Sequence, residues 1–492
     1  MASGAIMSLA FPPVDLGALA YVSLVPLAVF FRRPGRAGAL ATALCSAGLG
    51  AAFFPLLVSW IRLFGMPAYL ALVTMESLIL VLCLQVGRLA AIRLTGGWRA
   101  AGFPIAFLAA EYVRSHLPFG GFPWGGLGYS QHDNLTALRV APYTGVWGVT
   151  LMVAAVNAMV AEAIERVKMR PVLAALWIVA AWVVALAPAI LPAGRAEGRS
   201  ARIAIVQGNA PENLDDFHAD DRQVFLDHLR LSSSLDARAL SLVVWPESAI
   251  EVDPLSDPTY GAPLAETIRA AGVPFVVGAS IDLPGRRFVN TSLFFRADGT
   301  LAGRYVKQHL VPFGEYVPLR SFLEPLVKDL QRVPRDGIPG KRSEVFQLSS
   351  GTFASVICYE STYPDLVRSF VSEGARLIVV STNNASFERT SASRQHVAFS
   401  QLRAAEHRMW VAHAALTGIS AVVDPSGRVL ESTPLFRPAV LSPTVRFSTG
   451  TTLYGRLGDW LPAGSLGLVA AGLVAGVAGR IRGRSSTAAS VP

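Results

Sequence analysis

The stretch Phe353-Ala354-Ser355-Val356-Ile357-Cys358-Tyr359-Glu360-Ser361-Thr362 decides the fold of the more polar half of this chain. Its apolar first half is typical of a buried strand, and residues 362–373 continue as an amphipathic helix with Ser361 or Thr362 as a candidate N-cap. A cysteine at such a turn lies near helix N–H groups, which favour a thiolate and can stabilise an oxyanion. Taken alone, Cys358 is equally well explained as a nucleophile or as an inert buried thiol.

The composition separates the chain into membrane and soluble parts. Of its 492 residues, 52% are hydrophobic and only 16% are charged, which is too apolar for an ordinary soluble protein. The apolar residues cluster before about Leu191 and after about Trp460, and the segment between them has a globular composition. Cys45 and Cys83 lie in the apolar part, so Cys358 is the one cysteine outside a predicted span.

The apolar runs predict a polytopic helical bundle of about eight spans, since one span needs about 20 mostly apolar residues. A short run, 5–12, is the candidate for the first span. The other seven runs are 14–31, 39–61, 67–92, 101–114, 145–164, 172–191 and 465–479.

Basic residues follow every second run, which places those loops in the cytoplasm. They are Arg32, Arg33, Arg36, Arg88, Arg93, Arg99, Arg166, Lys168, Arg170, Arg480, Arg482 and Arg484. We therefore expect transmembrane helices in 1–193, an extracytoplasmic domain in 194–458, a last transmembrane helix in 459–482 and a disordered tail in 483–492. These arginines account for most of the net charge of +9, and the soluble region carries no basic stripe, which argues against a nucleic-acid partner.

The soluble region predicts a layered domain of strands and helices, so that the whole chain is of the α+β class. Expected strands are 203–206, 242–245, 275–277, 291–295, 353–357, 377–380 and 419–423. Expected helices are 222–235, 262–271, 362–373 and 393–407. In such folds the functional groups collect where strands end.

Two further strand ends carry candidate functional groups. Val243-Val244-Trp245-Pro246-Glu247-Ser248 runs from a strand into a proline, which cannot continue a central ladder, and presents Glu247 directly after it. The second segment, 305–316, contains Lys307, His309 and Glu315. Lysine is rare in this chain, with four residues against thirty-nine arginines. A lysine in an apolar stretch therefore suggests a need for a compact ammonium.

Together, Cys358, Glu247 and Lys307 could supply a nucleophile, a base and a cation for reaction at a carbonyl group. A metal site is poorly supported, because one cysteine and scattered histidines give no ligand spacing, and no cofactor is expected. A Cys–His pair stays open as the rival arrangement. Its candidate histidines are His309, His396, His407 and His413.

Several motifs resemble known families. The segments around Glu247, Lys307 and Cys358 resemble the Glu-Lys-Cys triad of the nitrilase (carbon–nitrogen hydrolase) superfamily. Val206-Gln207-Gly208-Asn209, Gly121-Phe122-Pro123-Trp124 and Gly128-Tyr129-Ser130-Gln131 narrow the resemblance to the bacterial apolipoprotein N-acyltransferase family.

This resemblance implies an αββα sandwich on the periplasmic side of a bundle of eight helices in the bacterial inner membrane. It implies transfer of an acyl chain from a phospholipid to the N-terminal amine of a diacylglyceryl-cysteine lipoprotein, through a thioester and with ping-pong kinetics. Cys358 would be the nucleophile, Glu247 the base and Lys307 the oxyanion stabiliser. Supporting positions would be Glu315, Glu360 and Tyr359, the last through its backbone N–H.

Three segments depart from the family pattern. The first is Asn383-Asn384-Ala385-Ser386-Phe387, in which Asn384 stands for the family's Asp and Ser386 for its Trp. The second is 215–217, where the family often has a Trp. The third is His413, which stands where Arg is common. These changes put the substrate preference in question.

Two other functions compete with acyl transfer. A membrane-anchored amidase or nitrilase would use the same triad on a small amide, with water as the acceptor. A transporter or receptor would place ionisable residues deep in its spans, and Glu76 is the main candidate for such a residue.

Overall fold

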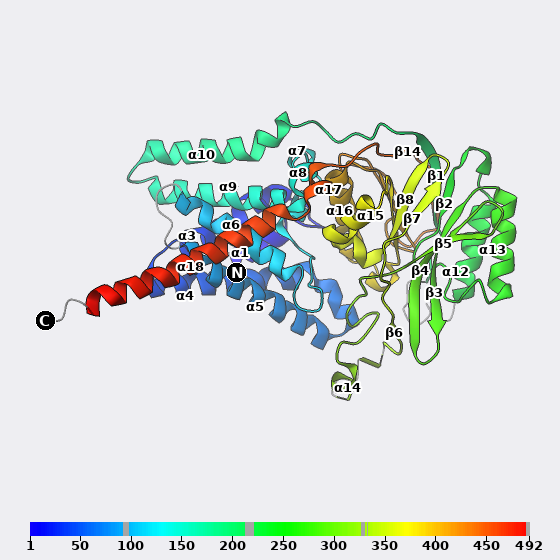
Figure 1. The fold of residues 1–492 in the computed structure, drawn as a ribbon, viewed down its shortest axis with the longest axis horizontal. Coiled ribbons are helices and arrows are strands. Elements are labelled where there is room, and N and C mark those ends of the chain that lie inside the picture. The colour runs from blue at the N-terminus through cyan, green and yellow to red at the C-terminus, as the bar shows by residue number, and fades with distance from the viewer. Residues whose placement is uncertain (92–97, 212–220, 326–329, 332, 489–492) are drawn as a thin grey trace. The chain divides into compact units, whose positions relative to one another are not determined.

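The computed structural model describes residues 1–91, 98–211, 221–325, 330–331 and 333–488. It divides into two compact units, one of Met1–Pro192 with Asp459–Pro492 and the other of Ala193–Gly458 (Figure 1). The predicted segment 215–217 and the predicted cytoplasmic Arg93 lie outside the described residues.

The first unit is built from helices. They are α1 (Ala2–Ser8), η1 (Gly17–Leu19), α2 (Ala20–Ser23), α3 (Val25–Phe31), α4 (Gly35–Leu57), η2 (Ser59–Phe64), α5 (Met66–Ala91), α6 (Trp98–Arg114), η3 (Leu127–Gln131), α7 (Leu135–Leu138), α8 (Ala141–Thr144), α9 (Val146–Arg166), α10 (Pro171–Leu186), η4 (Ala187–Ile190) and α18 (Trp460–Ala488).

Five helices in the described part of the chain are long and apolar enough to cross a membrane: α4, α5, α9, α10 with η4, and the Trp460–Ala478 part of α18. The runs predicted at 5–12, 14–31 and 101–114 overlap with shorter helices, namely α1, the segment Gly17–Phe31 and α6. The count of eight spans therefore stays a prediction. Helix α18 continues to Ala488, into the segment predicted as a disordered tail.

A buried ion-pair cluster occupies the interior of the helical unit. Arg114 at the end of α6 lies 2.9 Å from Glu76 of α5 and 3.4 Å from Glu111. Its guanidinium also donates to the carbonyls of Phe122 and Trp124, at 2.8 and 2.9 Å. Glu76, which kept the transporter hypothesis open, thus helps to hold the arginine that anchors the Gly-Phe-Pro-Trp motif.

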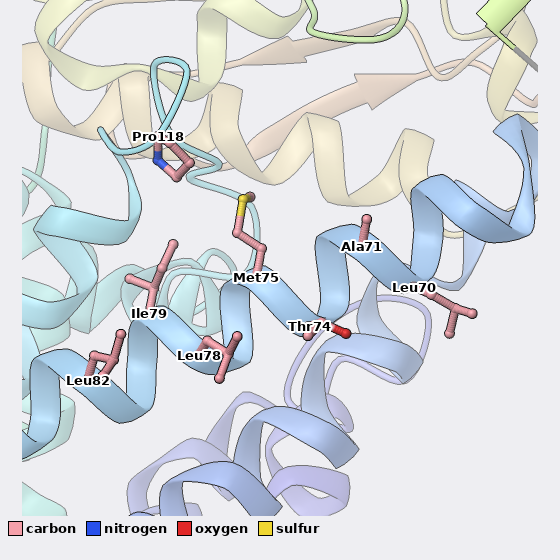
Figure 2. A pocket seen from close by; sticks show the side chains of 8 residues that line it. All are labelled: Leu70, Ala71, Thr74, Met75, Leu78, Ile79, Leu82 and Pro118. Carbon is pink, nitrogen blue, oxygen red and sulfur yellow. The ribbon is translucent and has the colours of Figure 1, made fainter. Parts of the chain in front are cut away.

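The outer face of α5 carries an apolar groove of about 550 Å³. Figure 2 shows its lining, which consists of Leu70, Ala71, Thr74, Met75, Leu78, Ile79 and Leu82 of α5, with Pro118 from the segment that follows α6. Hydrocarbon chains are as apolar as these leucines, so the surface suits a lipid environment.

The second unit contains two sheets. The first is eight-stranded in the order β13-β1-β2-β3-β4-β5, with β14 beside β1 and β6 beside β4. Its strands are β1 (Ser200–Gln207), β2 (Leu242–Val244), β3 (Phe275–Leu283), β4 (Arg287–Phe295), β5 (Leu301–Val306), β6 (Asp336–Gly337), β13 (Ala439–Leu441) and β14 (Thr444–Arg446). The β1–β2 and β2–β3 pairs are parallel.

The second sheet has six strands in the order β12-β11-β10-β9-β8-β7. They are β7 (Val345–Leu348), β8 (Gly351–Ile357), β9 (Ile378–Thr382), β10 (Val411–Ala415), β11 (Ala421–Val423) and β12 (Val429–Ser432). Strands β8, β9 and β10 are parallel to one another, so their carboxyl ends share one edge.

Helices cover the outer faces of both sheets, which gives four layers (Figure 1). Helices α12 (Asp221–Ser233) and α13 (Pro258–Ala271) pack on the first sheet, and α15 (Pro364–Ser372) and α16 (Ala392–His407) pack on the second. The remaining short helices are η5 (Ala237–Ala239), α14 (Arg320–Leu323), η7 (Cys358–Thr362), η8 (Ala385–Phe387) and α17 (Leu453–Leu457). The predicted α+β class, with an αββα sandwich, is confirmed.

Buried polar contacts join the inner faces of the two sheets. The hydroxyls of Ser292 on β4 and Ser355 on β8 lie 2.8 Å apart. The Ser381 hydroxyl on β9 donates to the Trp245 carbonyl after β2, at 3.4 Å. These contacts join β4 to β8 and the residue after β2 to β9, and the candidate site forms where β2, β5 and β8 end.

Candidate active site

Glu247 reaches the site because β2 ends against a tightly packed turn. Trp245 is fully buried, and Pro246 ends the ladder. A Cβ on Gly278 of β3 would lie 2.1 Å from the Pro246 carbonyl oxygen and 2.6 Å from the Glu247 Cα, so glycine permits this close approach. The Glu247 side chain is buried and accepts hydrogen bonds from Lys307 at 3.1 Å and from the Asn383 backbone N–H at 2.7 Å.

Lys307 follows β5 and is held between two carboxylates. Lys307 is 1% exposed, and its ammonium lies 3.1 Å from Glu247 and 2.9 Å from Glu315. Burial opposes the charge, but the two carboxylates together raise the pKa of Lys307 well above its usual value. The side chain is therefore a fixed cation inside the sandwich.

Asn290 on β4 completes this cluster and was not predicted. Its side-chain amide donates to Glu247 at 2.6 Å and to Glu315 at 3.0 Å, while the other oxygen of Glu315 accepts from the Val311 backbone N–H at 2.7 Å. Asn290 spaces the two carboxylates around Lys307. An amide residue directly before the predicted strand 291–295 was the sequence signal that could have identified it.

Cys358 begins η7 directly after β8. Its φ is 52°, in the left-handed region that non-glycine residues rarely adopt. Burial raises the pKa of the Cys358 thiol, and the negative charge of Glu247 adds to this, while Lys307 and a hydrogen bond from the Thr382 side chain lower it. The net rise means that Cys358 rests as a neutral thiol and needs a base to become a nucleophile.

Glu360 connects the turn of Cys358 to the turn of Lys307. One carboxylate oxygen accepts from the Tyr305 hydroxyl at 2.7 Å and from the backbone N–H groups of Gln308 and His309 at 2.6 and 3.1 Å. The other accepts from the Ile357 N–H at 2.8 Å. Burial raises the pKa of Glu360 to about 7 despite these donors.

The histidines considered as partners of the thiol make other contacts. His396 lies 3.1 Å from the carbonyl oxygen of Cys358, the His309 ring packs on Tyr363 at 4.4 Å, and His413 lies 2.8 Å from the Ser400 hydroxyl. Both ring nitrogens of His407 are buried without a hydrogen-bond partner. The carboxylate of Glu247 therefore fits the role of general base better than a histidine does.

The segment that departs from the family pattern contacts the site directly. The Asn383 backbone N–H bonds Glu247, and the Asn384 side chain contacts Thr382 and His396 at 3.0 and 3.1 Å. Tyr359 is buried, with its ring 5.2 Å from that of Tyr363. Among the described residues, no group of three or more His, Cys, Asp or Glu side chains could hold a metal ion.

Comparisons with known proteins cover both units. Residues 3–159 match the family model described as apolipoprotein N-acyltransferase N-terminal domain, and residues 202–453 match the carbon–nitrogen hydrolase model. The apolipoprotein N-acyltransferase of Geobacter metallireducens is 30% identical over 95% of this chain and 93% of its own length. That of Gloeobacter violaceus is 31% identical over 98% of this chain and 94% of its own length.

Among solved structures, a mutant of the Nesterenkonia AN1 amidase from the nitrilase superfamily is 18% identical, with a TM-score of 0.39. The match covers 56% of this chain and 96% of the amidase chain.

Proposed function

The chain belongs to the apolipoprotein N-acyltransferase family, and on that premise we propose that it carries a fatty acyl chain from a phospholipid to the N-terminal amine of a diacylglyceryl-cysteine lipoprotein. The acyl chain is held in between as a thioester on Cys358. One observation carries this assignment of roles: Glu247, Lys307 and Cys358, from the ends of β2, β5 and β8, meet in one buried cluster.

The first half-reaction forms the thioester. Glu247 takes the proton of Cys358 as sulfur bonds to the ester carbonyl carbon of the phospholipid. Lys307 and the Tyr359 N–H stabilise the oxyanion that develops. The C–O bond then breaks, and Glu247 returns the proton to the alcohol oxygen of the departing lysophospholipid.

The second half-reaction uses the same groups. Glu247 removes a proton from the incoming lipoprotein ammonium, and the amine attacks the thioester carbon. Glu247 passes this first proton to water, and the oxyanion is again stabilised by Lys307. As the C–S bond breaks, the nitrogen loses a second proton, which Glu247 delivers to the departing sulfur. One site serving two substrates in turn predicts ping-pong kinetics.

Glu315 supports this cycle by keeping Lys307 charged. When Glu247 is protonated, Lys307 still lies 2.9 Å from the Glu315 carboxylate. The ammonium thus keeps a counter-ion throughout the reaction, which preserves its value as an oxyanion stabiliser in a buried site.

The apolar helices and the family membership support a location in the bacterial inner membrane with the sandwich on the periplasmic side. Both substrates carry lipid anchors, so a membrane-bound enzyme meets them where they reside. The alternation of basic loops along the sequence supports the same orientation.

The test is intact mass spectrometry of the purified full-length chain. After incubation with phosphatidylethanolamine in mixed micelles, we expect an acyl adduct that disappears when a diacylated lipopeptide is added. Cys358→Ala should show neither adduct nor transfer, whereas the control Cys83→Ala, in helix α5, should retain both. Adduct loss to water at an equal rate without lipopeptide would favour the hydrolase alternative, and acylated lipopeptide from Cys358→Ala would refute the thioester.

A further inference from the structure

His396 on α16 holds the backbone of the proposed nucleophile. The residue is 1% exposed. Its Nε2 lies 3.1 Å from the Cys358 carbonyl oxygen and 2.9 Å from the hydroxyl oxygen of Ser361, and Ser361 itself donates to the Cys358 carbonyl at 2.9 Å. Two side chains therefore converge on the carbonyl of the peptide group that joins Cys358 to Tyr359.

That peptide group also contains the Tyr359 N–H. The cis bonds among the described residues are both X–Pro bonds, so the bond between Cys358 and Tyr359 is trans. In a planar trans peptide the C=O and N–H point in opposite directions. A donor that fixes the direction of the Cys358 carbonyl consequently fixes the direction of the Tyr359 N–H.

The backbone at Cys358 needs such support. A φ of 52° in a non-glycine residue costs about 1–3 kcal/mol and persists only when its surroundings hold it. The direction of the Cys358–Tyr359 peptide depends on ψ of Cys358 and φ of Tyr359, and rotation about these two bonds would turn the N–H away. A hydrogen bond to the carbonyl also polarises the amide and strengthens its N–H as a donor.

The other side of the ring is compatible with this role. Nε2 donates when it carries the proton, and Nδ1 is then an acceptor. Nδ1 lies 3.4 Å from the Thr382 hydroxyl and 3.1 Å from the Asn384 side chain. The amide of Asn384 can turn its Nδ2, which has no hydrogen-bond partner, toward Nδ1.

We propose that His396 is a positioning residue that holds the Cys358–Tyr359 peptide with its N–H directed at the oxyanion of both half-reactions. The inference rests on the proposed function, since it needs an oxyanion to form. It assigns to His396 a role in transition-state stabilisation and none in activating the thiol.

The test compares two reactions of Cys358 in the full-length chain. Acylation by phosphatidylethanolamine in mixed micelles passes through an oxyanion, whereas alkylation by iodoacetamide does not. For His396→Phe we expect acylation to slow by about 100-fold and alkylation to change by less than about threefold. His396→Gln, which can still donate an N–H, should restore acylation to within about tenfold of the wild type.

Two further variants keep the result interpretable. His413→Phe replaces a neighbouring buried histidine whose ring lies 5.1 Å from His396 and should leave both rates within about threefold. Ser361→Ala removes the second donor to the carbonyl and should slow acylation selectively even if His396→Phe does not fold.

Equal slowing of both reactions in His396→Phe would overturn the proposal, because His396 would then act on the thiol or on the fold. Unchanged acylation in that variant would overturn it as well. A wild-type chain that is alkylated but never acylated would instead contradict the proposed function itself.

Discussion

Replacement of Lys307 by Met separates the structural and chemical roles of the buried cation. The wild-type cluster contains one ammonium and two carboxylates, at 3.1 and 2.9 Å from Nζ, with side-chain exposures of 1%, 6% and 15%. Lys307→Met keeps a similar side-chain length but leaves Glu247 and Glu315 facing each other without a counter-ion. The formal charge of the cluster changes from −1 to −2.

The expected loss of stability is large. Removing one partner of a buried ion pair costs about 3–5 kcal/mol, which corresponds to a fall in melting temperature of roughly 6–20 °C for a domain of this size. Loss of an oxyanion donor costs about 100- to 1000-fold in rate, or about 2.7–4 kcal/mol. Both effects are expected in the single variant, so that variant alone cannot tell them apart.

The double variant Lys307→Met/Glu315→Gln resolves them. It restores the formal charge of −1, and the new amide can donate toward Glu247. We expect the melting temperature, followed by intrinsic fluorescence in detergent, to recover by at least half. The acylation rate, followed by the mass of the Cys358 adduct, should stay at least about 100-fold below the wild type.

Recovery of acylation together with stability in the double variant would refute this reasoning. Lys307 would then serve only to neutralise the carboxylates. Lys307→Arg provides the complementary measurement, since its charge is kept but its planar group cannot replace a compact ammonium, and it should also lose most of the activity.

Three further outcomes are expected. Glu360→Gln should lower both the melting temperature and the acylation rate. The NH₂ group of the glutamine would face one of the buried donors that Glu360 accepts from, and leaving that donor unsatisfied costs about 1–3 kcal/mol. Asn290→Asp should slow acylation at pH 7 by at least about tenfold, since a third carboxylate then lies beside Glu247 and Glu315; an unchanged rate would exclude a spacing role. Burial lowers the pKa of His407 to about 3, so the unfolded chain binds more protons than the folded one between about pH 3 and 6.5. As the pH is lowered from 6.5, the free energy of unfolding of the wild type should therefore fall by about 1.4 kcal/mol per pH unit more than that of His407→Leu. Parallel pH–stability curves for the two proteins would contradict this.

The elements of the sandwich were mostly predictable because their residues carry a local pattern. The apolar run ending at Ile357 and the run ending at Trp245 both form strands. Strand β10 was not expected, since His413 interrupts it, and of β5 only the end beside Lys307 was expected, since Gly303 and Arg304 interrupt the rest. They form because neighbouring strands supply hydrogen-bond partners for their backbones, a tertiary effect that outweighs local propensity.

The candidate site was predictable only in part. Glu247, Lys307 and Cys358 stand out as chemically capable residues at the ends of apolar runs, and the structure brings them together. Asn290 was not assigned a role, and His396 was considered only as one of four possible partners of the thiol, because each acts through contacts with residues far away in the chain. The hydrogen bond from the Asn383 backbone N–H to Glu247 does not depend on the side chain at position 383, so residue type gives no sign of it.

The sequence by itself determined the local features: the apolar runs, the strand ends and the functional groups that follow them. These depend on residues close together in the chain, and spacing reveals them. Tertiary structure alone decided that Lys307 lies between two carboxylates and that Cys358 is a buried, neutral thiol. Charge interactions and burial depend on distances between side chains from separate strands, and only the packing of the two sheets sets those distances.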